Sequence, residues 1–214
     1  DRTKQGIFSR EGLRGFDLEG KTLGIVGCGK IGAKVAQIAR SFAMRVIVFD
    51  PNQDEKLAQE MGFDYVNLLE DLLGQSDVIS LHAPLSEKTR HMINMESVEL
   101  IKPGALLINT ARGDLVQTAA LLKALDEGRI AGAGLDVLER ERLIHEEAEV
   151  LSKGSSSNQE LSTILGNHIL LNNPNVIITP HNAFNSEEAV KKILDTTVKN
   201  IEAYLKGDMV NLVA

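Results

Sequence analysis

Short apolar runs alternate with amphipathic segments along most of this chain. Six runs rich in valine, isoleucine and leucine predict β-strands, over residues 22–27, 45–49, 77–82, 105–109, 132–137 and 175–179. Most of these runs are apolar at nearly every position, which is typical of parallel strands that are covered on both faces. Because helical patterns separate the runs, the sequence predicts a doubly wound parallel α/β sheet.

Two of the intervening segments predict helices with a defined apolar face. After the first strand, the residues at helical spacing are Ile31, Val35, Ile38, Ala39 and Phe42. A last helix begins after Ser186, whose hydroxyl can cap it, and ends at Gly207. The predicted buried stripe of this last helix consists of Val190, Ile193, Leu194, Thr197, Ile201 and Leu205.

Composition and charge narrow the class of protein. The chain has 214 residues, of which 43% are hydrophobic and 25% charged, as in soluble globular proteins with a substantial core. Its net charge of −7 argues against nucleic acid or an anionic membrane as a partner. A single cysteine excludes an intramolecular disulfide and favours a reducing, cytoplasmic compartment. No apolar run is long enough for a transmembrane helix.

A glycine turn joins the first predicted strand to the first helix. Gly27, Gly29 and Gly32 have the spacing of a dinucleotide-binding turn, in which they allow a tight turn, approach of a pyrophosphate and close helix packing. The helix N-terminus would face the phosphates. Asp50 ends the second strand, where an acid binds the adenosine ribose and disfavours a 2′-phosphate. The sequence therefore predicts a Rossmann domain that binds NAD rather than NADP.

The predicted Rossmann domain covers residues 21–207, after a polar lead-in or hinge over residues 1–20. Residues 142–173 interrupt the alternation of strands and helices and contain a serine run. They are predicted to form a surface excursion, flexible around the serines and helical on either side.

Charged and titratable side chains follow three of the later strands. Arg112 comes after the fourth run, Glu141 after the fifth and His181 after the sixth, at the edge where open α/β sheets bind ligands. A guanidinium there could hold a carboxylate through two hydrogen bonds, although a solvated surface arginine would have the same position. If Glu141 reaches His181, its charge would favour the imidazolium and make His181 a proton donor.

Six ordered motifs resemble the cofactor-binding domain of the D-2-hydroxyacid dehydrogenases, which include D-lactate, glycerate and phosphoglycerate dehydrogenases. The motifs lie at 24–32, 82–85, 101–105, 109–113, 132–137 and 179–181. The motif at residues 181–184 and the long separation between Glu141 and His181 in the sequence favour the D-lactate dehydrogenase branch. The resemblance covers nearly the whole chain.

The resemblance implies a catalytic set of Arg112, Glu141 and His181. Arg112 would orient a 2-keto acid, His181 would give its carbonyl oxygen a proton, and Glu141 would hold His181. Glu139 is interpreted as a neighbour of the catalytic glutamate, because its spacing from Arg112 does not match the family. His91, His145 and His168 are interpreted as surface residues, and no metal site is expected because no cysteine and histidine cluster has metal-ligand spacing.

The same resemblance implies the contacts of the cofactor. Lys30 and Ile31 would meet the pyrophosphate, with the glycines of the turn, and Asp50 would meet the ribose. The remaining cofactor-binding residues would be Ala83, Pro84 and Thr89 in the nucleotide groove, Thr110 beside the nicotinamide, Asp136 at its carboxamide, and Ala111.

In this family a separate substrate domain precedes the cofactor domain, and the C-terminal tail returns to it. We therefore expect the chain to hold mainly the cofactor-binding half, with the substrate domain absent and residues 208–214 starting the return segment. The family also implies a homodimer formed through the cofactor domain. An alternative is a non-catalytic, NAD(H)-sensing interaction protein of the co-repressor type, which keeps the same domain.

Overall fold

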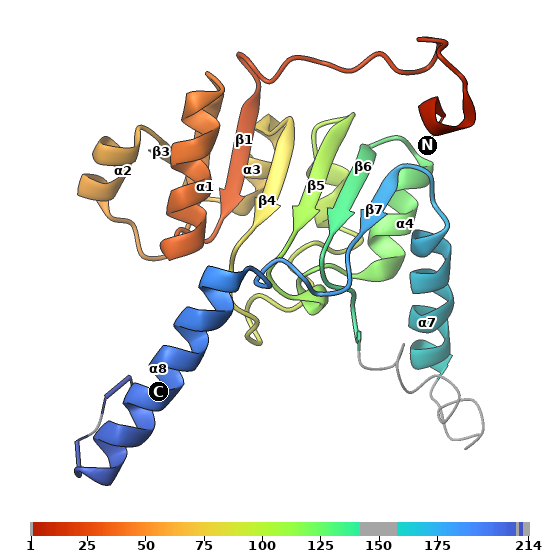
Figure 1. The fold of residues 1–214 in the computed structure, drawn as a ribbon. Helices are drawn as coiled ribbons and strands as arrows, with labels where there is room; N and C mark the ends of the chain where they lie inside the picture. Colours follow the sequence, from red (N-terminus) through yellow and green to blue (C-terminus); the bar gives the residue numbers. More distant parts are fainter. Residues whose placement is uncertain (1, 142–157, 209, 212–214) are drawn as a thin grey trace.

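A computed structural model describes residues 2–141, 158–208 and 210–211 (Figure 1). Its parallel sheet has seven strands in the order β3-β2-β1-β4-β5-β6-β7. The strands are β1 Thr22–Val26, β2 Arg45–Phe49, β3 Asp64–Tyr65, β4 Val78–Leu81, β5 Ala105–Asn109, β6 Ile130–Leu135 and β7 Val176–Ile178. The described α-helices are α1 Lys30–Ser41, α2 Glu55–Met61, α3 Leu69–Gln75, α4 Thr118–Asp126, α7 Asn158–Leu171 and α8 Glu187–Leu205. Short 3-10 helices are η1 Thr3–Gln5, η2 Ser97–Leu100 and η3 Gly113–Leu115.

This strand order confirms the predicted Rossmann fold. All six predicted strands are present, two with the predicted ends and four with ends that differ by one or two residues. Among the strands of the described residues, the sequence missed one, β3, which pairs with β2 at the sheet edge. Two residues are too few to produce a recognisable apolar pattern, and Asp64 at its start is exposed.

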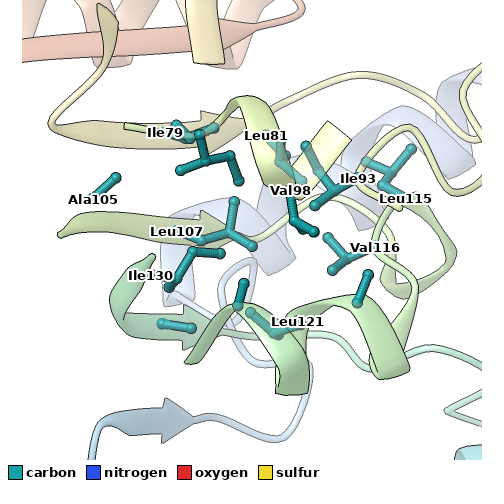
Figure 2. Close-up of a cluster of buried hydrophobic side chains, with 14 of the residues drawn as sticks. Ile79, Leu81, Ile93, Val98, Ala105, Leu107, Leu115, Val116, Leu121 and Ile130 are labelled. Atoms are coloured by element: carbon teal, nitrogen blue, oxygen red, sulfur yellow. The ribbon is translucent and has the colours of Figure 1, made fainter. Parts of the chain in front are cut away.

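The hydrophobic core lies on both faces of the sheet. Ile79, Leu81 and Leu107 pack on one face with Ile93 and the side chains of the loops and helices beyond them (Figure 2). On the other face, strand residues pack against α1 and α2, in a cluster that contains Leu23, Ile25, Ala36, Ala39, Met44, Val46, Val48, Ala58 and Phe63. The nearly continuous apolar runs are thus explained by strands that alternate between two buried faces.

The predicted apolar face of α1 is wrong for most of its members. Ile31, Ile38 and Phe42 are exposed, and the buried residues of the helix are Gly32, Ala36 and Ala39. A Cβ added at residue 32 would lie 2.2 Å from the carbonyl oxygen of Gly27. The helix packs so closely on β1 that only small residues fit between them, and the larger apolar side chains face away.

The buried stripe predicted for α8 is also not buried in this chain. No residue of α8 is buried, and Ile193, Leu194, Ile201 and Leu205 are all more than half exposed. Figure 1 shows the helix projecting away from the sheet. The amphipathic pattern correctly predicted a helix, but no described residue covers the apolar side of that helix.

The second part of the predicted surface excursion belongs to the folded core. Helix α7 packs against α4, and its Ile164, Asn167 and Leu170 are buried. Leu170 joins the main core cluster. Residues 142–157, including the serine run, lie outside the described residues. No helix in the described part of the chain has the length and apolar character needed to cross a membrane.

Candidate functional site

The segments that leave the carboxyl ends of the strands share one edge of the sheet. All seven strands are parallel, and the arrowheads of β1, β4, β5, β6 and β7 point to the same side in Figure 1. The predicted site residues fall on the segments after β1, β2, β4, β5, β6 and β7. The topology therefore brings residues that are distant in sequence to one edge, which is where α/β sheets of this kind bind their ligands.

The glycine turn after β1 is shaped by two close backbone approaches. Gly27 has φ of +92°, and a Cβ there would lie 2.7–2.9 Å from the backbone of His82 and Ala83. A Cβ at Gly32 would meet the Gly27 carbonyl oxygen. Gly29 differs from both, because a Cβ at this position would have no neighbour within 4 Å. Contacts within the protein therefore explain why residues 27 and 32 are glycines. They do not explain Gly29, where the space is open for a ligand.

The N-terminus of α1 opens onto the same space. Gly29 is its N-cap and provides no side-chain hydrogen bond, so the first amides of the helix, at Lys30 and Ile31, have no side-chain cap. The side chains of Lys30 and Ile31 are exposed. Uncapped helix amides, the positive end of the helix dipole and a glycine without neighbours together fit the pyrophosphate of a dinucleotide.

Asp50 lies beside this turn and is held there by two backbone amides. Its Oδ2 accepts the N–H of Cys28 at 2.7 Å and its Oδ1 accepts the N–H of Asn52 at 2.8 Å. Burial, reinforced by the negative charge of Asp50, raises the pKa of the Cys28 thiol. The thiol is therefore protonated at neutral pH.

The segment after β4 forms a compact turn against Gly27. Ala83 is buried, and the Oγ1 of Thr89 donates to the carbonyl oxygen of Pro84 at 2.6 Å while accepting the N–H of Ser86 at 2.8 Å. Thr89 thus fixes the shape of the predicted nucleotide groove. His82 at the strand end contacts the Ser80 hydroxyl through Nε2, and burial lowers the pKa of its imidazole.

The turn that carries Arg112 is organised by Asn109, the buried last residue of β5. Asn109 accepts the N–H of Ala111 at 3.0 Å and donates its amide N–H to the carbonyl oxygen of Arg112 at 2.9 Å. The Arg112 side chain is exposed, and its Nη1 donates to the Ala111 carbonyl oxygen at 2.7 Å. Asn109 is the first residue of the motif at 109–113, but its role in shaping this turn was not predicted from the sequence.

His181 and Glu141 meet at the other end of the edge. The Nδ1 atom of His181 lies 3.3 Å from Oε1 of Glu141, and both side chains are partly exposed. Contact at Nδ1 leaves Nε2 as the nitrogen that can exchange a proton with a ligand. Phe184 packs its ring edge-to-face on the imidazole. Among the described residues, no hydrogen bond or ion pair joins Arg112 to this pair, so the three predicted catalytic residues share an edge without forming one contact network.

Asp136 is buried below His181 and fixes the backbone around it. Its carboxylate accepts the Thr179 hydroxyl at 2.5 Å, the Asn182 N–H at 2.7 Å and the Ala183 N–H at 2.9 Å. Burial alone would raise the pKa of Asp136, but these hydrogen bonds and the nearby His181 outweigh it and hold that pKa below its usual value.

A cleft with a volume of about 280 Å³ lies between the ends of β5, β6 and β7. Thr110 and Asp136 line it, together with Ile108, Gly134, Leu135, Ile177, Thr179, Asn182 and Ala183. The cleft is mostly apolar with a few polar groups, a lining that suits a flat heteroaromatic ring. It brings together Thr110 and Asp136, the two residues predicted to contact the nicotinamide.

The prediction that His91 is a surface residue is wrong. Its Nε2 lies 2.8 Å from Oε1 of Glu139, a carboxylate that is only 5% exposed. One weak signal was available in the sequence, because Glu139 follows the apolar pair Val137 and Leu138 shortly after β6. Of the other histidines without a predicted role, His168 lies exposed on α7 and His145 lies outside the described residues.

The chain matches the family model described as D-isomer specific 2-hydroxyacid dehydrogenase, NAD binding domain, over residues 1–183. It is 41% identical to a glyoxylate reductase of Thermococcus litoralis over 195 residues, which cover 91% of this chain and 52% of that protein. It is 38% identical to a D-lactate dehydrogenase of Escherichia coli over 207 residues, covering 97% of this chain and 60% of the relative.

A solved structure is similar over nearly the whole chain. The D-lactate dehydrogenase from Aquifex aeolicus, complexed with NAD and lactic acid, superposes with a TM-score of 0.84 at 40% identity. The match covers 97% of this chain and 60% of that one. The chain therefore spans a little over half the length of the relatives it matches.

Proposed function

Since the chain belongs to the NAD binding domain family of the D-isomer specific 2-hydroxyacid dehydrogenases, we propose that it serves in the interconversion of a D-2-hydroxy acid and the corresponding 2-keto acid. The observation that carries this proposal is the contact between His181 and Glu141 at the ligand-binding edge of the sheet. An imidazole held by a carboxylate on Nδ1 can donate or accept a proton at Nε2.

Each of the three edge residues has a distinct role in the proposed reaction. The exposed Arg112 guanidinium binds the carboxylate of the 2-keto acid through paired hydrogen bonds and orients its carbonyl group. His181 donates a proton from Nε2 to the carbonyl oxygen, and takes it back in the reverse direction. Glu141 positions the ring and stabilises the imidazolium. NADH, when bound, supplies the hydride that reduces the carbonyl carbon.

The structure supports the proposed cofactor contacts with separate features. The open space over Gly29 and the uncapped amides of Lys30 and Ile31 suit the pyrophosphate. Asp50, held beside the turn, suits the ribose hydroxyls. Turn residues Ala83, Pro84 and Thr89 would border the adenine side, while Thr110, Ala111 and Asp136 would border the nicotinamide.

The substrates to test come from the names of the relatives. Glyoxylate and pyruvate are the 2-keto acids that a glyoxylate reductase and a D-lactate dehydrogenase reduce. Because this chain spans only part of those relatives, the activity is proposed for the full-length natural protein. We expect the 214-residue chain alone to bind NADH and to reduce 2-keto acids slowly or not at all, since Arg112 and His181 are open to water on the substrate side.

We propose in addition that the active protein is a homodimer formed through this domain. Large apolar side chains stay exposed on α1, at Ile38, at its C-cap Phe42, and on α8, at Ile193 and Ile201. Exposed apolar surface of this kind is typical of interfaces. Light scattering at several concentrations tests the stoichiometry. A cytoplasmic location is proposed from the single cysteine, and cell fractionation tests it.

The decisive experiment follows NADH consumption by the full-length natural protein with a panel of 2-keto acids that includes glyoxylate and pyruvate. Arg112→Lys keeps the charge but loses the paired hydrogen bonds, so KM for the keto acid should rise and kcat should fall. Arg129→Lys, at the opposite end of the strands, is the matched control and should keep both values. Tight NADH binding without reduction of any keto acid would contradict the proposal.

A further inference from the structure

Glu139 is a buried carboxylate whose hydrogen bonds connect several separate elements. Its Oε1 contacts Nε2 of His91 at 2.8 Å, and its Oε2 accepts the N–H of Thr118 at 2.7 Å. Thr118 is the first residue of α4, so the carboxylate also lies at the positive end of that helix. A buried carboxyl group with this many partners is costly to remove, because its partners would be left unsatisfied.

The backbone of Glu139 is anchored as firmly as its side chain. Its carbonyl oxygen accepts the amide N–H of Asn167 at 3.0 Å, and Asn167 is itself buried on α7. The Oδ1 of Asn167 accepts the Thr118 hydroxyl at 3.2 Å, which closes a network between α4, α7 and the segment after β6. Both oxygens of the side chain and the peptide of Glu139 are thus held by His91, by the start of α4 and by α7.

This anchored residue lies two positions before Glu141. The N–H of Glu141 donates to the carbonyl oxygen of Leu138 at 3.1 Å, so residues 138–141 form one tight turn with Glu139 inside it. The Glu141 side chain then contacts His181. Any displacement of Glu139 must be transmitted to Glu141 through this turn.

The same turn also contacts the segment that carries Arg112. A Cβ at Gly113 would lie 1.9 Å from the Leu138 carbonyl oxygen and 2.7 Å from the Glu139 nitrogen. The backbone after Arg112 is therefore in direct contact with the peptide that joins Leu138 to Glu139. Through this contact, Glu139 lies at the junction of the arginine turn and the glutamate turn.

The residues around Glu139 fit a positioning role better than a metal site. His91, Asp114 and Glu139 form a group whose possible ligand atoms all lie within 4.8 Å of one another. Asp114, however, is paired with Arg90 at 2.6 Å, and a guanidinium there repels a cation. Both Glu139 oxygens already have protein partners.

We propose that Glu139 is a positioning residue for the proposed reaction, and that it acts by holding the turn from which Glu141 reaches His181. The catalytic effect of Glu139 rests on the proposed function. Its effect on the position of His181 does not depend on that function. His91 and Thr118 are the groups that keep the Glu139 carboxylate in place.

The test is a double-mutant cycle in the full-length natural protein, with Glu139→Gln, Glu141→Gln and the double variant. Glu139→Gln keeps the side-chain volume and should lower kcat for 2-keto acid reduction by roughly ten- to a hundredfold, because small displacements of reacting groups have effects of that size. The dissociation constant of NADH should stay the same. The double variant should be no slower than Glu141→Gln alone, and the pH profile of kcat/KM should change in the same way in all three.

A second measurement follows the imidazole directly. Carbon–proton NMR spectra of the histidine rings, with His181 assigned from His181→Ala, should show the same displacement of the His181 signal in Glu139→Gln as in Glu141→Gln. Ser76→Ala is the matched control, since it removes a buried side-chain hydrogen bond far from the edge and should lower only the melting temperature.

The outcomes separate the two proposals. If Glu139→Gln lowers the melting temperature but leaves both kcat and the His181 signal unchanged, Glu139 is only a structural anchor and the inference is wrong. Additive losses in the double variant would also overturn it. If no 2-keto acid is reduced by the natural protein, the proposed function fails, and the NMR comparison alone still decides whether Glu139 controls His181.

Discussion

The backbone carbonyl oxygen of Asp136 accepts the N–H of His181 at 2.9 Å, a contact between residues that follow the neighbouring strands β6 and β7. The carboxylate of Asp136 accepts the next two amides, of Asn182 and Ala183. His181 adopts a left-handed backbone conformation with φ of +50°. A buried residue of one strand thus fixes the backbone that presents the proposed proton donor from the next strand.

This arrangement predicts a specific loss of stability in acid. Because the pKa of Asp136 is lower in the folded protein, its carboxylate stabilises the fold fully at pH values above the unfolded-state pKa of about 3.9. That stabilisation is lost as the pH falls through the folded-state pKa. Asp136→Asn should therefore show a flatter decline of unfolding free energy between about pH 5 and pH 2 than the natural protein. Urea unfolding of both proteins across this pH range measures the decline.

Asp126→Asn provides the comparison for that experiment. Asp126 is an exposed aspartate on α4, and its replacement should leave the acid dependence as it is. Asp136→Asn should also be less stable at neutral pH, by about 1–3 kcal/mol, because an amide cannot accept all three hydrogen bonds. An unchanged slope in acid would show that the Asp136 hydrogen bonds do not favour its ionised form.

Replacement of His181 tests its role as proton donor. His181→Ala should lower turnover by roughly 10²–10⁴-fold with little change in NADH affinity. Since asparagine tolerates a positive φ better than alanine, His181→Asn keeps the backbone and isolates the loss of the imidazole. His168→Ala, on an exposed histidine of α7, should keep the natural rate. Steady-state rates with pyruvate decide the matter, and a rate for His181→Asn equal to the natural one would remove His181 from the mechanism.

The three glycines of the turn should respond differently to a methyl group. Gly29→Ala meets no neighbour within 4 Å, so its unfolding free energy should change by less than about 1 kcal/mol while NADH binding weakens at least about tenfold. Gly32→Ala would collide with the Gly27 carbonyl oxygen and should lose about 1–3 kcal/mol of stability. Calorimetry and NADH fluorescence titration measure the two effects. Equal NADH affinity in Gly29→Ala would show that the pyrophosphate does not lie over Gly29.

The choice between NAD and NADP should depend on Asp50. Asp50→Ala removes the negative charge beside the turn and should shift the preference towards NADP, by about tenfold, which corresponds to about 1.4 kcal/mol. Asp50 also accepts the Cys28 amide, so some loss of affinity for both cofactors is expected. Asp54→Ala removes a nearby acid that only caps α2 and should leave the preference unchanged. A constant ratio of kcat/KM values for the two cofactors in Asp50→Ala would contradict the ribose assignment.

The fold was predictable because its signal is local and repeated. Each interior strand is a continuous apolar run, and the glycine spacing marks the first turn independently of any long-range contact. The exceptions have physical causes. Strand β3 is too short to produce a pattern. On α1 only small residues fit against the sheet, so the apolar side chains of Ile31 and Ile38 face away from it.

The candidate site was predictable only in part. Arg112, Glu141 and His181 stand at strand ends, so the topology alone places them on one edge. The supporting contacts could not be predicted, because they join residues far apart in sequence. Glu139 reaches His91 across 48 positions and Thr118 across 21, and neither spacing leaves a recognisable trace in the chain.

The exposure of α8 has a consequence for how this chain melts. A 19-residue helix with no buried side chain depends on its own hydrogen bonds, and isolated helices of this length are marginal in water. Its amide hydrogens should exchange with solvent deuterium long before those of β1, and its ellipticity should fall below the main thermal transition. Whatever covers its apolar side in the assembled protein would have to offset the entropy that the helix loses on becoming ordered, so docking and helix formation would be one event.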